Sequence, residues 1–535
     1  RILIAGVCAF WQSNRDACDR IHSHSILVCS SILKDRRRSL SRPMPVSDSH
    51  VEHPPAVDHQ PLRVAIKNIG CKLNLYESEA LRSGFSRAGF DMVGFEEEAD
   101  VYVVNTCTVT GAGDADSRRA VRTARRTGEE AIVVATGCYA QRRPGELSDA
   151  GANLIVANGE KAQLVEAVQR RIQGSPDLNL NPMSPPKTEQ FLQIDGMVEG
   201  GRTRGTLQIQ DGCDEHCTYC IIPQVRGVSV SRPVQEILTQ ARAMVEAGYV
   251  ELALTGVHTG SFGHERHGTD SSPTELVDLL AQLEGVDGLR RIRLNSVEPN
   301  FVTDELIGFA AHSSHLCRHY HIPLQSGDDT VLRRMGRRYD RQHYADRIQR
   351  LADTVPGACI GADVIVGFPG ETEAQFENTH ELLDSLPMSY LHVFSYSLRQ
   401  GTPAERLPDH APRAVKSTRA RRLIEWSQAR RLAFHRSHVG QQVEVLIEET
   451  RRSDGSGLAV GRTDNYVQVL IEDGGGVEDP RVQAHQLVNV KIREAREQFA
   501  FGSLSTPMTG TIPAVPLPGV ETGSAEHPGE HAIGV

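Results

Sequence analysis

The chain has 535 residues, of which 39% are hydrophobic and 24% charged, and its formal net charge is −10. This length predicts about three domains. The composition is that of a globular protein, and the negative charge argues against non-specific polyanion binding while allowing one basic patch. No apolar run is long enough to span a membrane. Eleven cysteines in a chain of this length favour metal ligands in a reducing compartment over a disulfide scaffold, so we expect a cytoplasmic protein with no membrane partner.

The first segment, residues 1–61, shows no clear helical or strand periodicity. It begins at Arg1, and its apolar start lacks the basic residues that precede the core of a signal peptide. We interpret it as a disordered or mis-assigned extension, with the natural start near Met44. We expect no function for Cys8, Cys18 and Cys29.

Residues 62–174 alternate short apolar strands with helices, a pattern that predicts an open parallel α/β sheet. Strands are expected at 62–67, 100–105 and 131–136, and helices at 76–88, 115–127 and 160–173. The following residues, 175–202, are rich in Pro, Asn, Ser and Gly and are predicted to be a linker.

Residues 203–412 repeat the alternation in about six units, which predicts a partial parallel (β/α)6 barrel with its site at the carboxyl ends of the strands. Strands are expected at 206–210, 251–255, 291–295, 319–323, 361–366 and 390–396. Residues 413–436 predict a basic helix, residues 437–497 a small antiparallel β-barrel, and residues 498–535 a disordered tail.

The most informative motif is the C-x3-C-x2-C triplet of Cys213, Cys217 and Cys220, with Tyr219 before its third cysteine. Three thiolates can hold three irons of a [4Fe–4S] cube and leave the fourth iron open to a substrate, whereas an electron-transfer ferredoxin normally closes its cluster with four cysteines. The alternative is a structural zinc site, which needs a fourth ligand such as His216 or a remote residue.

A second set of cysteines, Cys71, Cys107 and Cys138, follows three strands of the first domain. Ligands of open parallel sheets lie at this edge, so the three thiols could converge on a second cluster. The alternative is three separate buried thiols, which are common, and we expect this state for Cys317 and Cys359.

The triplet with its aromatic residue resembles the signature of radical S-adenosylmethionine (SAM) enzymes. Together with Gly-Cys-Lys-Leu-Asn at 70–74, Asn-Thr-Cys-Thr-Val-Thr at 105–110 and Gly-Cys-Tyr-Ala-Gln at 137–141, it makes residues 62–497 similar to the radical SAM methylthiotransferase family. The resemblance implies two [4Fe–4S] clusters, one held by Cys213, Cys217 and Cys220 and an auxiliary one held by Cys71, Cys107 and Cys138.

Family members insert sulfur and a methyl group into an unreactive C–H bond. The resemblance implies that one SAM methylates sulfur at the auxiliary cluster. A second SAM gives a 5′-deoxyadenosyl radical, which removes hydrogen from C2 of adenosine 37 in the tRNA anticodon loop. A low-potential electron donor such as flavodoxin or ferredoxin and a sulfur donor are implied as partners.

Three branches of the family act on N6-threonylcarbamoyladenosine 37, on isopentenyladenosine 37, or on an aspartate of a ribosomal protein. The motif at 105–110, Ser117-Arg118, and the runs at 254–260 and 321–327 resemble the threonylcarbamoyl branch. The isopentenyl branch would continue after Asn-Thr-Cys with Ser-Ile-Arg, which is absent at this position. A non-enzymatic alternative is a zinc-stabilised RNA-binding protein.

The resemblance implies that SAM is bound by the aromatic residue of the triplet and by several residues at predicted strand ends. They are Tyr219, Gly256, Ser296, Glu298, Gly367, Phe368 and Pro369. Thr372 and Gln375 predict a capping box for the next helix, and Gln325 is a candidate for facing the substrate. We expect His258, His319 and His321 to be packed or solvated rather than ligands.

RNA contact is expected from the basic helix and the small barrel, which resembles the RNA-binding TRAM module. Phosphate contacts require cations, and the helix offers Arg419, Arg421, Arg422, Arg430 and Arg431. Five arginines between 118 and 126 offer a second such surface. The barrel has no conspicuous aromatic residue other than Tyr466, so base stacking on it is weakly supported.

Overall fold

The structure is a computed structural model that describes residues 61–176, 178, 180–181, 190–194, 203–264, 275–453, 456–472 and 482–505. The expected extension and most of the expected tail therefore lie outside the described residues. From Leu62 onward the described residues belong to one compact unit. No helix within the described ranges has both the length and the apolar character needed to cross a membrane.

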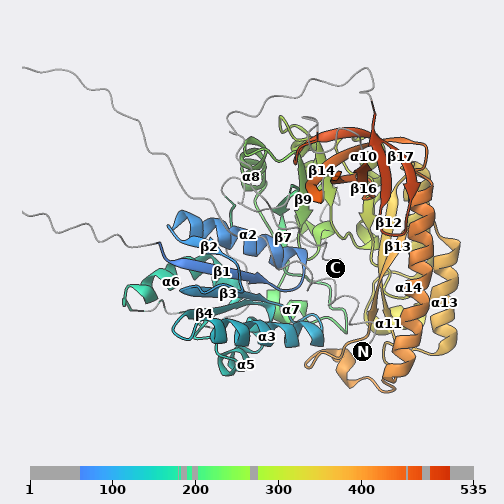
Figure 1. Ribbon diagram of the computed structural model, residues 1–535. Coiled ribbons are helices and arrows are strands. Elements are labelled where there is room, and N and C mark those ends of the chain that lie inside the picture. Colours follow the sequence, from blue (N-terminus) through green and yellow to red (C-terminus); the bar gives the residue numbers. More distant parts are fainter. Residues whose placement is uncertain are drawn as a thin grey trace, which may run out of the picture. The chain divides into compact units, whose positions relative to one another are not determined.

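The first domain is a parallel sheet with strand order β2-β1-β3-β4-β5 and helices on both faces (Figure 1). Its strands are β1 (Arg63–Asn68), β2 (Asp91–Val93), β3 (Val101–Thr106), β4 (Ile132–Gly137) and β5 (Leu154–Val156). Its helices are α2 (Lys72–Arg87), α3 (Gly111–Thr127), α4 (Cys138–Arg142), α5 (Pro144–Asp149) and α6 (Leu164–Ile172). This confirms the predicted open parallel α/β sheet.

Alternate strand residues build a core on each face of this sheet. Tyr102 and Val104 of β3 pack with α3 and α5, whereas Val101 and Val103 pack with α2 and α6. Strands buried on both faces read as continuous apolar runs, which is why the sequence revealed them. Helix α3 begins at Gly111, earlier than expected, because the Thr110 side chain caps it by accepting a hydrogen bond from the Gly113 amide.

The second domain contains six parallel strands, as predicted for a partial (β/α)6 barrel. They pair in two sheets, β6-β9-β10 and β11-β12-β13, and a parallel bridge between Ile292 and Leu316 joins them. The strands are β6 (Gly205–Gln208), β9 (Glu251–Thr255), β10 (Arg291–Leu294), β11 (His319–His321), β12 (Cys359–Val366) and β13 (Tyr390–Ser395). The short strands β7 (Gln210–Asp211) and β8 (Val230–Ser231) form a separate pair.

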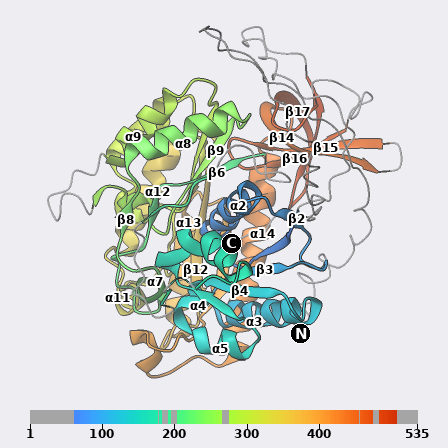
Figure 2. The same ribbon diagram turned by 90° about the vertical axis from the view of Figure 1, so that its left-hand side faces the viewer.

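Helices accompany these strands, and the longer ones cover the outer face of the barrel (Figure 2), whereas the short α7 packs against Cys138 of the first domain. They are α7 (Ile222–Arg226), α8 (Val234–Glu246), α9 (Glu275–Glu284), α10 (Asp304–His312), α11 (Asp329–Met335), α12 (Arg341–Thr354) and α13 (Glu373–Ser385). The expected capping box is present: the Thr372 hydroxyl accepts from the Gln375 amide, and the Gln375 side chain accepts from the Thr372 amide.

The barrel strands bury apolar side chains outward and polar side chains inward. Leu252, Ile292 and Ala362 belong to the core beneath the helices. Since side chains alternate between the two faces of a strand, the residues beside them face the barrel interior. These interior residues include Glu251, Arg291, Arg293, His319, His321 and Asp363. The barrel therefore encloses charged and hydrogen-bonding groups rather than a second apolar core.

Helix α14 (Arg413–Arg436) follows the barrel and leads into a closed barrel with strand order β14-β15-β16-β18-β17. Its strands are β14 (Gln442–Ser453), β15 (Ser456–Thr463), β16 (Gln468–Glu472), β17 (Leu487–Ala495) and β18 (Ala500–Leu504). The predicted end at residue 497 is too early, because β18 pairs with β17 and, in parallel, with β16. Residues 500–504 therefore belong to this barrel and not to the expected tail.

Candidate active site

The triplet Cys213, Cys217 and Cys220 lies in the loop between β7 and α7. Gly212 opens this loop with a φ of 70°, and a Cβ there would lie 1.8 Å from the Val228 carbonyl oxygen, so a side chain does not fit. Burial, with the neighbouring thiols adding to it, raises the pKa of both Cys213 and Cys220 to about 12. Metal coordination deprotonates thiols and so reverses this effect of burial. The donor set therefore fits the irons of a cluster.

Thr218 fastens the cysteine loop to the neighbouring elements. Its amide donates to the Met335 carbonyl at 2.8 Å, and its carbonyl accepts from the Ala404 amide at 2.8 Å. Its hydroxyl donates to the Arg334 carbonyl at 2.8 Å. Two of these hydrogen bonds hold the cysteine loop at the end of α11, and the third ties it to the segment at Ala404.

The residues expected to bind SAM at the end of β12 lie beside this loop. The rings of Tyr219 and Phe368 meet edge to face with 6.4 Å between centroids. Gly367 has a φ of 70°, and a Cβ at this position would lie 2.3 Å from the Lys416 side chain. Pro369 is buried next to them. The structure thus brings Tyr219 and the Gly367–Pro369 turn together, while their contact with SAM stays a prediction.

The remaining expected SAM residues lie at the carboxyl ends of β9 and β10. The Thr259 hydroxyl donates to the Ser296 carbonyl at 2.6 Å and so joins the two loops. Gly256 lies against Gln210, whose amide oxygen would be 2.8 Å from a Cβ at position 256. Glu298 forms an ion pair with Arg337. These residues share the barrel edge with the cysteine loop, as predicted for a site at the strand ends.

Arg337 is a site residue that the sequence did not single out. Its guanidinium donates to the Cys217 sulfur at 3.1 Å, pairs with Glu298 and lies 4.9 Å from the centre of the Tyr339 ring. It therefore places a positive charge between a cysteine sulfur and an expected SAM residue. It stands in the run Arg-Arg-Met-Gly-Arg-Arg, and a basic run does not reveal which of its members turns inward.

The second set of cysteines converges, as expected from their shared place after strands. Cys71 precedes α2, Cys107 follows β3 and Cys138 begins α4, and β1, β3 and β4 are neighbours in the sheet. The Cys107 sulfur would lie 2.8 Å from a Cβ at Gly70, the residue before Cys71. Burial raises the pKa of Cys107 to about 12, with Cys138 and Cys71 adding to the shift. The thiols thus lie within electrostatic reach of one another, and the cysteines of the described residues are free thiols.

Helix α7 connects the two cysteine sets. Cys138 packs against Ile221, which follows Cys220 directly in the chain, and against Val225 of α7. The Cys138 thiol also contributes to the raised pKa of Cys220, after burial and the neighbouring Cys217. The two sets therefore approach one another across one helical turn, as required if both serve one reaction.

A buried ionic network at the end of α7 holds the two domains together at this point. Arg226 donates to Glu77 at 3.0 Å and to Asp211 at 3.1 Å, and to the Asn74 amide oxygen at 2.7 Å. Lys161 lies 2.5 Å from Glu77. Burial alone would raise the pKa of Glu77, but the two cations outweigh it and hold this pKa at about 2. Apart from Asn74, which stands in the motif at 70–74, these residues were not singled out from the sequence, since their partners are remote in the chain.

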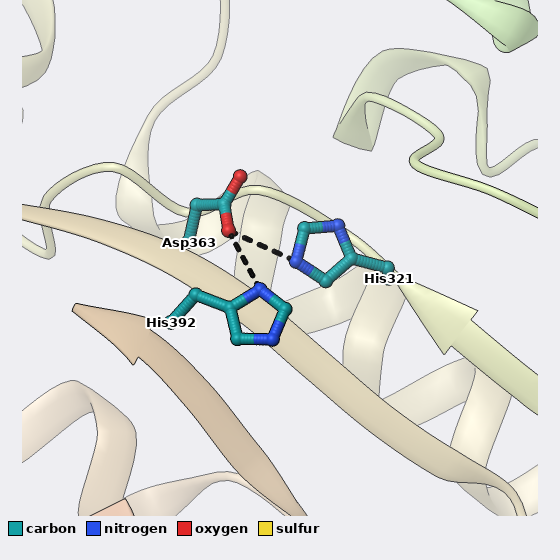
Figure 3. A group of neighbouring side chains, drawn as sticks. All are labelled: His321, Asp363 and His392. Carbon is teal, nitrogen blue, oxygen red and sulfur yellow. Dashed lines mark ion pairs between the residues drawn. The ribbon is translucent and has the colours of Figure 1, made fainter. Parts of the chain in front are cut away.

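The interior of the barrel holds a group of converging polar side chains, drawn in Figure 3. His321 Nε2 lies 3.0 Å and His392 Nδ1 3.3 Å from Asp363 Oδ1. The Lys72 ammonium donates to the Asn295 amide oxygen at 3.1 Å, so a side chain next to Cys71 reaches the barrel wall. His321 is buried, and the sequence did not reveal that Asp363 and His392 are its partners.

Gln325, expected to face the substrate, lies in the segment that follows β11. Its φ is 65°, an uncommon conformation for a non-glycine residue. Its amide donates to the Asp363 carbonyl at 2.8 Å and its carbonyl accepts from the Ile365 amide at 3.0 Å. The backbone of Gln325 is thus tied to β12 at the carboxyl edge of the barrel, and its contact with the substrate stays a prediction.

Arg419 requires a correction. It was expected to contact RNA, but it is only 5% exposed because its guanidinium faces α13 instead of solvent. It lies 2.7 Å from Glu371 and 2.9 Å from Glu373. A buried, doubly paired guanidinium does not reach a phosphate, so Arg419 fastens α14 to the barrel. The sequence placed it in a basic run and gave no sign of its acidic partners.

The other four arginines of α14 that were predicted to contact RNA differ in their exposure and in their ion pairs. Arg422 and Arg430 are partly exposed and pair with acidic residues of α13, and Arg431 lies 5.6 Å from the centre of the Tyr390 ring. Arg421 is exposed. Four of the five arginines predicted to face phosphate are therefore exposed to solvent at least in part, and Arg421 is the most exposed of them.

Tyr466 of the C-terminal barrel points toward the parallel barrel. Its ring stacks on His319 with 4.2 Å between centroids, and the Arg462 guanidinium lies 4.4 Å from its centre. Burial would raise the pKa of Tyr466, but the surrounding cations, Arg462 foremost, lower it to about 6. An aromatic ring occupied in this way does not present a base-stacking surface, in line with the weak support that the sequence gave to stacking.

Comparisons with protein families assign each of the three domains to a known family. Three family models match: "Uncharacterized protein family UPF0004" at residues 63–157, "Radical SAM superfamily" at 207–383 and "TRAM domain" at 436–505. The match to the TRAM domain includes β18, beyond the predicted boundary at 497.

Similar proteins span most of the chain. The threonylcarbamoyladenosine tRNA methylthiotransferase MtaB of Bacillus subtilis is 38% identical, over 82% of this chain and 95% of its own length. The protein of the same name from Aquifex aeolicus is 33% identical, over 77% of this chain and 97% of its own length. The tRNA-2-methylthio-N(6)-dimethylallyladenosine synthase of Thermus thermophilus is 33% identical, over 87% of this chain and 96% of its own length.

Proposed function

This chain belongs to the radical SAM tRNA methylthiotransferases, and we propose that it adds a methylthio group to C2 of N6-threonylcarbamoyladenosine at position 37 of tRNA. Its radical SAM domain implies SAM and a [4Fe–4S] cluster. Relatives named for threonylcarbamoyladenosine support the choice of substrate, at up to 38% identity against 33% for a dimethylallyladenosine synthase. The motifs at 105–110, 254–260 and 321–327 support the same branch.

The observation that carries the proposal is the approach of two incomplete cysteine sets across α7. We assign Cys213, Cys217 and Cys220 to the SAM-cleaving cluster, and Cys71, Cys107 and Cys138 to a second [4Fe–4S] cluster. A single electron-transfer or structural site would not need two open sets beside one another. When bound, the two clusters and SAM supply the radical and the methylthio group.

The chain's own residues would position these groups and exclude water. Tyr219, Phe368 and the glycine turn at 367 form the wall that we assign to the SAM adenine, and Glu298 at the end of β10 would accept hydrogen bonds from SAM. Arg337 keeps the Glu298 carboxylate and the Cys217 sulfur in place. Within the loop Cys217 is buried, and a site closed around it would protect a reactive carbon radical from solvent.

Lys72 supports the threonylcarbamoyl substrate over the isopentenyl one. It follows Cys71 directly, and its ammonium reaches Asn295 on the barrel wall. A threonylcarbamoyl group carries a carboxylate, whereas an isopentenyl group is apolar. A cation at this place favours the anionic group and makes burial of an apolar one costly.

We propose further partners from family membership and surface charge. Arg421, Arg422, Arg430 and Arg431, with the arginines of α3, would contact phosphates of the tRNA anticodon loop, and the C-terminal barrel would add RNA contacts of its own. A low-potential electron donor such as flavodoxin or ferredoxin and a sulfur donor complete the reaction. The expected cytoplasmic location agrees with these partners.

Nucleoside analysis of tRNA from a strain lacking this gene tests the substrate. Loss of 2-methylthio-N6-threonylcarbamoyladenosine is expected, with its unthiolated precursor accumulating and the isopentenyl-derived nucleoside unchanged. Wild-type protein should restore the product, and the Cys138→Ala and Cys213→Ala variants should not. Persistence of the product in the deletion strain, or loss of the isopentenyl-derived nucleoside instead, would assign the chain to another substrate.

Iron and sulfide content tests the two clusters separately. Anaerobically reconstituted protein should hold about eight irons, because each cube contains four. Cys138→Ala and Cys213→Ala should each lose about half of them. Zinc in place of iron would contradict the cluster assignment for both cysteine sets.

A further inference from the structure

His321, Asp363 and His392 lie on three adjacent parallel strands, and the register puts them on one face. Asp363 of β12 is directly opposite His392 of β13. His321 of β11 is opposite Gly361, which lies two residues before Asp363 and therefore on the same face. Because Gly361 has no side chain, His321 can lean along the strands toward the carboxylate, as Figure 3 shows.

The three facing atoms converge without forming hydrogen bonds. His321 Nε2, Asp363 Oδ1 and His392 Nδ1 all lie within 4.8 Å of one another. Each is shielded from solvent and has no hydrogen-bond partner among the described residues. The two N···O separations of 3.0 and 3.3 Å are short enough for hydrogen bonds, so it is the direction of the ring N–H groups that fails. Buried polar atoms without a partner are costly.

A cation among the three atoms would satisfy all of them at once. Metal–nitrogen and metal–oxygen bonds of about 2.1 Å to ligand atoms 3.0 and 3.3 Å apart subtend angles of roughly 90° to 105°. These angles suit tetrahedral or octahedral coordination. The spacing is therefore that of neighbouring ligands around one ion.

Ser296 provides the supporting contact that metal-binding histidines usually have. Its hydroxyl lies 2.7 Å from His321 Nδ1. With Nδ1 carrying the proton and donating it to this hydroxyl, Nε2 presents its lone pair toward Asp363. Such a contact fixes the tautomer and orientation of a ligating imidazole. Ser296 was expected to bind SAM, and this geometry gives it a second role.

We propose that His321, Asp363 and His392 bind one divalent transition-metal ion, such as Zn²⁺ or Fe²⁺, inside the barrel and separate from the cysteine sites. Two imidazoles and one carboxylate are a ligand set of this class of metal. Three protein ligands leave coordination positions open. Water or an oxygen atom of a bound nucleotide would occupy them.

Zinc binding to the cluster-loaded enzyme tests this site. The reconstituted protein is washed with chelator and titrated with Zn²⁺ against a competing chelator of known affinity. One tight site per chain is expected, which Asp363→Asn and His392→Ala abolish and Ser296→Ala weakens about 10- to 100-fold. The matched control is His380→Ala, which removes a histidine paired with Asp384 on a helix surface and should leave the tight site unchanged.

Two further readouts keep the test independent of folding and activity. Iron and sulfide content should be equal in all variants, which shows that the clusters and the fold survive. The X-ray absorption spectrum of zinc-loaded wild-type protein should show nitrogen and oxygen ligands only, since zinc at cysteine would add sulfur at about 2.3 Å. Zinc with sulfur ligands, or equal zinc affinity in wild type and Asp363→Asn, would overturn the proposal.

Discussion

Removal of the Glu77 charge should loosen the contact between the two domains by a predictable amount. Glu77→Gln keeps the shape of the side chain but leaves Lys161 without its carboxylate, while Arg226 retains Asp211. Burial and the two cations together lower the pKa of Glu77 from 4.5 to about 2, and this shift corresponds to about 3 kcal/mol. Breaking a buried ion pair from one side costs a similar amount, about 3–5 kcal/mol.

The pH dependence of this effect follows from the lowered pKa. A carboxyl group whose pKa is lower in the folded state stabilises that state above its unfolded pKa, and the stabilisation disappears as pH falls through the folded pKa. For Glu77 the loss spans the range from 4.5 down to about 2. The difference between wild type and Glu77→Gln should therefore be the same at pH 6 and at pH 8.

Hydrogen exchange of peptides from α2 and α7 measures this local loosening, because it reports the free energy of local opening. A loss of about 3 kcal/mol should accelerate exchange about 100-fold. The control is Glu166→Gln in the pair Arg170–Glu166, whose side chains are 43% and 55% exposed and whose loss should cost less than about 0.5 kcal/mol. Acceleration below about threefold in Glu77→Gln, or equal acceleration in the control, would refute the reasoning.

Three further predictions address the site and the RNA surface. Arg337→Gln should slow formation of 5′-deoxyadenosine from SAM by about tenfold or more, because the Cys217 sulfur and the Glu298 carboxylate lose their shared cation. An unchanged rate would show that Arg337 does not contribute to SAM cleavage. Gly212→Ala should lose about half of the bound iron, because its Cβ would meet the Val228 carbonyl oxygen at 1.8 Å; full iron content would show that the loop can relax. Arg421→Ala should lower the slope of the logarithm of the tRNA-binding constant against the logarithm of salt concentration by about one. Arg419→Ala should instead lower the melting temperature of the protein, because its ion pairs are buried. The opposite result for the two variants would show that Arg419 contacts RNA and that Arg421 stabilises the fold.

The cysteine sites illustrate which features local sequence can reveal. The triplet at 213–220 spans eight residues, so its sulfur atoms are held together by chain connectivity whatever surrounds them. The capping box of Thr372 and Gln375 is equally local. The second cysteine set could be predicted only after the strands had been predicted. Each of its members follows an apolar strand, and the carboxyl ends of neighbouring parallel strands lie at the same edge of the sheet.

Neighbours along the chain were enough to predict the alternation of strands and helices, the two cysteine sets and the branch motifs. Packing in three dimensions was needed to show that Arg419 is buried against α13, that Arg337 reaches Cys217, and that His321, Asp363 and His392 face one another. These groups come from segments 29 to 120 residues apart, and strand order and helix packing determine which of them meet. A charged residue is almost never fully buried unless an opposite charge pairs with it. The sequence does not show which residue is that partner, so a buried and an exposed charged residue look the same in a sequence.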